Sequence, residues 1–240
     1  MHKNSYVFLF AAIVTISCSL LLASAATLLR DRQQENIALD MRKNILECAG
    51  LINPSAGDIS RETILKIYED NIMSEVIDKN GNVVESKTVE DLDPKKDLDL
   101  YPLYYSEKNG EVNSYIVPIS GKGLWSTIYG YLALEHDVTT VMGITFYKHG
   151  ETPGLGGEIE KDWFKKSFIG KKIFSPAGEL VSIGVVKGKV TDKIPEDESY
   201  HYVDGISGST LTGNGLQNFL KSDLQKYKPF FEKIRNQEME

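Results

Sequence analysis

Residues 204–215 contain the side chains whose types and spacing most clearly suggest chemistry. They read Asp-Gly-Ile-Ser-Gly-Ser-Thr-Leu-Thr-Gly-Asn-Gly and stand directly before an amphipathic helical pattern. Backbone N–H groups at a helix N-terminus attract anions, above all phosphates, and Gly205 and Gly208 would allow a ligand close to the backbone. Four hydroxyl side chains accompany them: Ser207, Ser209, Thr210 and Thr212. The segment therefore suggests an anion site, although Ser and Thr are also common helix caps.

Several other kinds of site are disfavoured by the sequence. Residues 204–215 contain no Walker lysine and no βαβ pattern follows them, so a nucleotide P-loop does not fit. The two cysteines, Cys18 and Cys48, form no CxxC or Cys/His cluster, so no zinc, iron–sulfur or other metal site is predicted. No nucleophile–base pair is recognisable either. The chain is therefore not expected to break bonds with its own side chains.

Two further segments could contribute to the same site. Residues 121–134 read Gly-Lys-Gly-Leu-Trp-Ser-Thr-Ile-Tyr-Gly-Tyr-Leu-Ala-Leu, and residues 151–158 read Glu-Thr-Pro-Gly-Leu-Gly-Gly-Glu. By composition alone residues 151–158 are a loop, because Pro and Gly are turn residues. The first segment would likewise be a turn with Trp125, Tyr129 and Tyr131 packed in a core.

A motif resemblance gives residues 204–210 a more specific interpretation. The run Asp-Gly-Ile-Ser-Gly-Ser-Thr resembles the flavinylation motif Asp-x-x-(Ser/Thr)-Gly-Ala-Thr. In proteins with that motif, the last threonine carries FMN through a phosphoester bond to its side-chain oxygen. The resemblance therefore implies that Thr210 is the FMN acceptor. Ser209 stands where the motif has alanine, and Thr212 is the next hydroxyl, outside the motif.

The two upstream segments resemble one family that carries this motif. Residues 121–134 are similar to a stretch of NqrC, the C subunit of the Na+-translocating NADH:quinone reductase, and residues 151–158 resemble that family's second flavin-contacting loop. The G subunit of the Rnf complex is a related alternative, because it shares the flavinylation and Glu-Thr-Pro-Gly-Leu-Gly motifs. The Gly-Lys-Gly-Leu-Trp run favours the Na+-pumping enzyme. The resemblance covers about residues 115–220.

The resemblance implies a covalently flavinylated electron-transfer subunit that relays electrons from NADH towards ubiquinone. The flavin would supply the chemistry and the protein its position and surroundings. NADH should bind another subunit, because no Gly-x-Gly-x-x-Gly motif opens a helix here. The residues expected to bind the flavin are Asp204, Ser207, Gly208, Ser209, Thr210, Leu211, Thr212, Glu151, Thr152, Gly154, Leu155, Gly156, Leu124 and Trp125.

The same resemblance implies partners and a location. The partners would be the other five subunits of the reductase (A, B, D, E and F), together with a flavin transferase that uses FAD and recognises the site with the help of Asp204. The protein would lie in the inner membrane as a single-pass subunit, with its flavin domain on the periplasmic side. Two other classes remain open: a membrane-anchored binding or sensor domain that holds a free anion, and a purely structural assembly subunit.

The elements that must position these residues are predicted from hydrophobic periodicity. Short apolar runs indicate strands at residues 115–119, 129–134, 141–147 and 181–186. A helix is expected at residues 158–168, with Trp163 and Phe164 on its apolar side. Another begins near Thr210, and its apolar side chains recur at helical spacing: Leu216, Phe219, Leu220, Leu224 and Tyr227. The predicted fold class is an α+β (mixed α/β) FMN-binding domain preceded by one transmembrane helix.

The first half of the chain is expected to contain helices, a hairpin and a polar loop. Residues 30–52 show apolar positions every four residues, a second helix follows Ser60, and Asn80-Gly81 suggests a hairpin turn. Residues 86–110 are polar and are expected to form a surface loop. We therefore divide the chain into an anchor (1–32), a region of helical stalk, hairpin and loop (33–110) and an FMN-binding domain (111–240), with the last two expected to form one globular unit.

The longest uncharged run lies at the start of the chain. Residues from Tyr6 to Leu29 carry no charge, and a helix of this length is about 36 Å long, enough for a hydrocarbon core of about 30 Å. A retained membrane helix is favoured over a cleaved signal peptide, which Ala23-Ser24-Ala25 would also fit. The flanking charges do not fix its orientation. The net charge of −7 argues against nucleic-acid binding.

Overall fold

The computed structural model describes residues 4–53, 57–108 and 110–237. It divides into two compact units, one ending at Asp40 and the other beginning at Met41. In the first unit, helix α1 (Asn4–Cys48) exposes every side chain from Asn4 to Ala38. Within the described residues, α1 is long and apolar enough to cross a membrane. The two helical segments predicted from the sequence are thus one continuous helix, whose last residues belong to the second unit.

The second unit is built on one five-stranded antiparallel sheet. Its strands follow each other in chain order: β1 (Ile72–Asp78), β2 (Leu100–Lys108), β3 (Glu111–Lys122), β4 (Thr127–Glu135) and β5 (Val141–Lys148). The strands predicted at residues 115–119, 129–134 and 141–147 are confirmed. Their apolar side chains, such as Val117, Leu132 and Ile144, are buried in the core.

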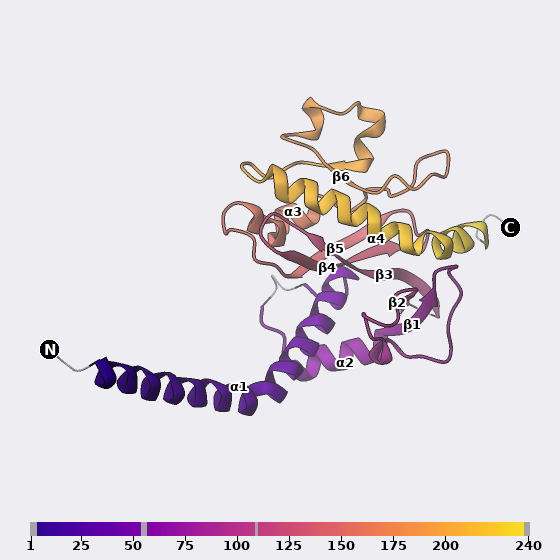
Figure 1. The fold of residues 1–240 in the computed structure, drawn as a ribbon. Helices are drawn as coiled ribbons and strands as arrows, with labels where there is room; N and C mark the ends of the chain where they lie inside the picture. The colour runs from indigo at the N-terminus through magenta and orange to yellow at the C-terminus, as the bar shows by residue number, and fades with distance from the viewer. Residues whose placement is uncertain (1–3, 54–56, 109, 238–240) are drawn as a thin grey trace. The chain divides into compact units, whose positions relative to one another are not determined.

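Helix α4 (Thr210–Gln237) lies along one face of this sheet, against β3 (Figure 1). The five apolar side chains predicted on its inner side are all buried. The contact is close, because a Cβ at Gly215 would lie 2.4 Å from the carbonyl oxygen of Lys122. The buried carboxylate of Asp223 also accepts a 2.7 Å hydrogen bond from the Ser120 amide. Packing on the sheet thus fixes where α4 begins.

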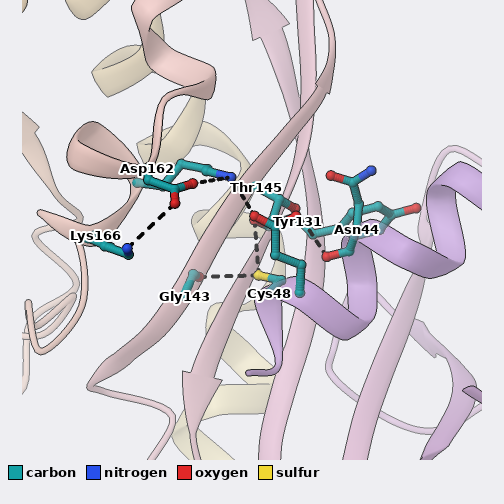
Figure 2. Close-up of polar contacts among 9 residues, drawn as sticks. Asn44, Cys48, Tyr131, Gly143, Thr145, Asp162 and Lys166 are labelled. Carbon is teal, nitrogen blue, oxygen red and sulfur yellow. Dashed lines mark hydrogen bonds and ion pairs between the residues drawn. The ribbon is translucent and has the colours of Figure 1, made fainter. Parts of the chain in front are cut away.

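The end of α1 and helix α2 (Arg61–Asn71) lie on the other side of the sheet from α4 (Figure 1). The Cys48 thiol donates to the carbonyl oxygens of Tyr131 and Gly143, at 3.3 Å each, and the Thr145 hydroxyl donates to the carbonyl of Asn44 (Figure 2). Burial raises the pKa of the Cys48 thiol. Cys48 therefore joins α1 to the sheet as a neutral, unpaired thiol.

The chain between β5 and α4 forms short elements that carry most of both walls of the candidate site. These are the 3-10 helix η3 (Gly156–Glu160), α3 (Asp162–Lys166), β6 (Gly184–Val185), the 3-10 helices η4 (Val190–Asp192) and η5 (Glu196–His201), and β7 (Tyr202–Val203). Strands β6 and β7 pair in parallel. In α3, Lys166 is paired with Asp162 at 3.5 Å (Figure 2).

Several element predictions are wrong. Residues 86–110 contain the 3-10 helix η2 (Val89–Asp91) and all of β2, with Leu103 buried in the core. The helix predicted at residues 158–168 is broken, since η3 ends at Glu160 before the short α3 begins. The strand predicted at 181–186 is reduced to β6, because Ser182 has a φ of +68°. The hairpin turn predicted at Asn80-Gly81 is confirmed, because the Val84 N–H donates to the Val76 carbonyl and Ile77 bridges Val83 across the turn, although no named strand directly follows it among the described residues.

Two aromatic predictions are corrected by burial. Trp163 and Phe164 were both expected on the apolar side of a helix, but Phe164 is fully buried and Trp163 is 50% exposed. Trp125, interpreted by composition as a core residue beside Tyr131, is 71% exposed. Both tryptophans therefore lie at the surface, where they indicate a binding site only if other exposed apolar side chains lie beside them.

Candidate functional site

A cavity of about 480 Å³ opens where β6 and β7 end and α4 begins. One wall is the segment 185–189, and the other is the segment 204–210. Gly205 allows the walls to meet, because a Cβ there would lie 2.1 Å from the Val186 carbonyl oxygen. Two hydrogen bonds join the walls: Gly205 N–H donates to Gly188 O at 2.9 Å, and Val190 N–H donates to the Asp204 carboxylate at 2.8 Å. Asp204 is thus bonded to the protein's own backbone.

The four hydroxyls before and within the first turn of α4 differ sharply in accessibility. Ser207 and Thr210 are exposed and line the cavity. Ser209 and Thr212 are buried, and the Thr212 hydroxyl donates to the Glu151 carboxylate at 2.7 Å. Thr210 is the first residue of α4. It therefore combines an accessible hydroxyl with the positive end of the helix dipole, which favours a phosphate.

Ser209 has a buried hydroxyl that finds no hydrogen-bond partner among the described residues. A buried polar group without a partner costs about 1–3 kcal/mol. We therefore expect Ser209→Ala to raise the free energy of unfolding by about 1 kcal/mol, because alanine removes the hydroxyl and leaves the backbone unchanged. Urea unfolding of the two proteins measures this difference. A loss of stability in the variant would show that the hydroxyl is satisfied.

Glu151 joins two of the predicted segments to the start of α4. Its buried carboxylate accepts hydrogen bonds from the amides of Trp125 (2.9 Å), Leu124 (3.3 Å) and Ser126 (3.3 Å), and from the Thr212 hydroxyl. Burial alone would raise the pKa of Glu151, but the hydrogen bonds from Thr212 and the three amides outweigh it, so its pKa lies below the ordinary value. The carboxylate is therefore ionised at neutral pH.

Four apolar side chains of the predicted site are exposed: Leu124, Trp125, Leu155 and Leu211. Glu151 bonds the Leu124–Trp125 turn to the first turn of α4, where Leu211 lies. Leu155 lies beside the motif, because a Cβ at Gly208 would be 2.9 Å from its Cδ2. Exposed apolar side chains near a cavity that also carries hydroxyls and two lysines favour a ligand with an aromatic body and a charged end.

The cavity brings together only part of the predicted site. Asp204, Ser207, Gly208, Ser209 and Thr210 line it. The structure places the remaining predicted residues outside its lining: Leu124, Trp125, Glu151, Thr152, Gly154, Leu155, Gly156, Leu211 and Thr212. Thr152 and Gly154 are exposed in the same loop as Glu151. Gly156 lies against Glu151 and Thr212, since a Cβ there would be 2.6 Å from the Thr212 hydroxyl oxygen.

Sequence reasoning missed the opposite wall of the cavity. Trp163, Lys187 and Lys189 line it, and all three are exposed. Two lysines on either side of Gly188 place positive charge opposite the start of α4, which suits an anionic ligand. The Lys-Gly-Lys run directly after an apolar strand pattern was the available signal. Its position across from Thr210 depends on the β6–β7 pairing, which the sequence does not reveal.

The fold and the site together define a flavin-binding class. A family model described as "FMN-binding domain" matches residues 123–225, a range that includes the Leu124–Trp125 turn, Glu151 and Thr210. The match covers both walls of the cavity. The chain therefore contains an FMN-binding domain, as the motif resemblance implied.

Comparisons over nearly the whole chain give the particular family. The chain is 35% identical to the C subunit of the Na(+)-translocating NADH-quinone reductase of Yersinia pestis, over 95% of this chain and 91% of that protein. It is 36% identical to the same subunit of Pasteurella multocida, over 93% and 91%. The crystal structure of the Parabacteroides distasonis protein of that name is also similar, with 34% identity, a TM-score of 0.72 and coverage of 85% and 96%. The chain belongs to the NqrC family, the C subunits of the Na+-translocating NADH-quinone reductase.

Proposed function

We propose that this chain is a covalently flavinylated electron-transfer subunit of the Na+-translocating NADH-quinone reductase, with FMN attached through a phosphoester bond to the Thr210 hydroxyl. The observation that carries the proposal is the position of Thr210. It is an accessible hydroxyl on the first residue of α4, within a flavinylation-like motif and on the wall of a cavity. When bound, FMN supplies reversible electron transfer.

The residues present fit such a group. The amides at the start of α4, with Lys187 and Lys189 across the cavity, provide positive potential for a phosphate. The cavity wall also has apolar surface from Trp163, Val185 and Ile206 for the body of the ligand. The exposed apolar group Leu124, Trp125, Leu155 and Leu211 would shield a ring from water.

Asp204 and the loop at residues 151–156 have supporting roles in this proposal. Asp204 accepts a hydrogen bond from the Val190 amide and so holds the two walls of the cavity together. In this proposal the resulting wall geometry presents Thr210 to a flavin transferase that uses FAD. The loop carries Thr152, Gly154 and Leu155, whose exposure suits contact with a flavin. Neither role requires the chain to break a bond itself.

The proposed partners are the other five subunits of the reductase, A, B, D, E and F. The apolar part of α1 would anchor the chain in the inner membrane as its one span, with the flavin domain on the periplasmic side. Electrons from NADH would pass through this chain towards ubiquinone, while NADH binding and ion translocation would take place on other subunits. A covalent bond suits a carrier on that side, because a lost flavin could not easily be replaced there.

Intact mass tests the proposal. The full chain is produced with and without a flavin transferase, and both samples are denatured before measurement. We expect an FMN-sized addition and in-gel flavin fluorescence only in the sample made with the transferase. A co-expressed protein of unmodified mass and without fluorescence would contradict the covalent attachment and favour a free-anion site.

A further inference from the structure

The hydrogen bonds to Glu151 occupy the whole of its carboxylate. An ionised carboxylate has about four lone-pair positions, and four donors reach this one. Oε1 accepts from the amides of Trp125 and Ser126, and Oε2 accepts from the Leu124 amide and the Thr212 hydroxyl. No acceptor position is left for a ligand. Whatever Glu151 does at the flavin site, it does through the groups that it holds.

The backbone around Glu151 is shaped to bring these groups together. A Cβ at Gly123 would lie 2.6 Å from Oε1, and a Cβ at Gly156 would lie 2.7 Å from Oε2. Side chains at either position would displace the carboxylate. The two glycines therefore allow the Gly123–Ser126 turn, the 151–157 loop and the first turn of α4 to meet at one group.

The charge of Glu151 has no cationic partner among the described residues. Its partners are amides and a hydroxyl, which stabilise an anion but do not neutralise its net charge. Thr212, one of those partners, is two residues from the proposed flavin acceptor. A fixed negative charge in a partly buried place acts over several ångströms, because water screens it weakly there.

We propose that Glu151 is a positioning residue of the flavin site: it fixes the Leu124–Ser126 turn to the start of α4, and its unneutralised charge makes the bound flavin harder to reduce. The inference rests on the proposed flavin site. In the positional part of the proposal, Glu151 holds Trp125 and Thr212 in place through its hydrogen bonds to them. The electrostatic part follows because reduction adds negative charge to a flavin attached at the first turn of α4, the turn that Glu151 contacts through Thr212, and a nearby anion disfavours the reduced form.

Two variants test whether the contacts and the charge of Glu151 matter, or whether replacing any carboxylate in this segment has the same effect. Glu151→Gln has the same shape but no charge. One side of its amide can still accept from Trp125 and Ser126, while its NH2 group faces the Leu124 N–H, another donor. Glu160→Gln is the matched control, because Glu160 is an exposed carboxylate of the same segment whose described contact is with His149 at 3.3 Å.

The first measurement is hydrogen exchange over residues 122–128 in the full chain without flavin. Loss of a hydrogen bond to a charged group makes local opening of the turn easier, so we expect exchange at the Leu124 amide to be about tenfold faster or more in Glu151→Gln. Glu160→Gln should exchange like the unchanged protein. Equal exchange in all three proteins would overturn the positional part.

The second measurement is the midpoint potential of the flavin in the three flavinylated proteins. We expect a higher potential in Glu151→Gln than in either the unchanged protein or Glu160→Gln. An equal potential in the two variants would overturn the electrostatic part. If the unchanged protein carried no flavin in its intact mass, the proposed function would fail instead, and the exchange experiment would still report on the Glu151 contacts.

Discussion

We expect the Thr210→Val variant to carry no covalent flavin when it is produced together with a flavin transferase. Valine keeps the β-branched shape of threonine but has no hydroxyl, so no phosphoester bond can form at this position. Neighbouring hydroxyls should not replace it. Ser209 and Thr212 are both buried, and Thr212 is also hydrogen-bonded to Glu151. In-gel flavin fluorescence should fall to background, and the intact mass should be that of the unmodified chain.

Ser207→Ala is the matched control for this experiment. Ser207 is the other exposed hydroxyl on the cavity wall, so the comparison asks which of the two hydroxyls carries the flavin. Whatever Ser207 contributes to binding, Ser207→Ala should still show covalent flavin in its intact mass. Circular dichroism of both variants would show that the fold is intact. Covalent fluorescence retained in Thr210→Val but lost in Ser207→Ala would make Ser207 the acceptor and refute the assignment to Thr210.

The part of the site on α4 could be predicted because it depends on local sequence. Leu216, Leu220 and Leu224 recur at helical spacing, and the glycine- and hydroxyl-rich segment before them marks the helix start. The structure begins α4 at Thr210, as expected. Strands β3 to β5 could be predicted for the same reason, because each contains an apolar run between turn residues. In these elements, local pattern and tertiary packing favour the same structure.

The rest of the site depends on contacts between distant segments, which one sequence does not record. Glu151 was selected from a motif, but its main partners are backbone amides of Leu124, Trp125 and Ser126, and an amide carries no residue-type signal. Lys187 and Lys189 reach the cavity only because β6 pairs with β7. Strands of two residues are too short to show the alternation of apolar and polar side chains that predicts a longer strand.

Strand β2 shows a different limit. Residues 86–99 are rich in Asp and Lys, and this polar stretch hid the apolar run Leu100-Tyr-Pro-Leu-Tyr-Tyr directly after it. Leu103 and Tyr104 are buried in the folded chain, and β2 lies inside the sheet between β1 and β3. Because residues 86–110 are polar when taken together, the sequence predicts a loop there, and the prediction wrongly includes the central strand β2. Pro102 also gives no support to a central strand, because proline inside an apolar run usually argues against one.

The Leu220→Ala variant should lose about 2–5 kcal/mol of unfolding free energy, the usual cost of removing a fully buried leucine side chain. Leu220 is 0% exposed and lies on the side of α4 that packs against the sheet. The loss combines the transfer free energy of the deleted atoms with a cavity that the neighbouring core can fill only in part. Urea unfolding of the full chain in detergent measures it.

Lys221→Ala is the control, because Lys221 is the next residue on the same helix but is exposed. Exposed substitutions of this kind usually change stability by about 0.5 kcal/mol or less, and both variants replace a good helix former by alanine. A Leu220→Ala protein as stable as Lys221→Ala would show that α4 is not held by its apolar side. Since the sheet contact sets the position of Thr210, we also expect Leu220→Ala to slow flavin attachment near its unfolding midpoint, where Lys221→Ala remains fully modified.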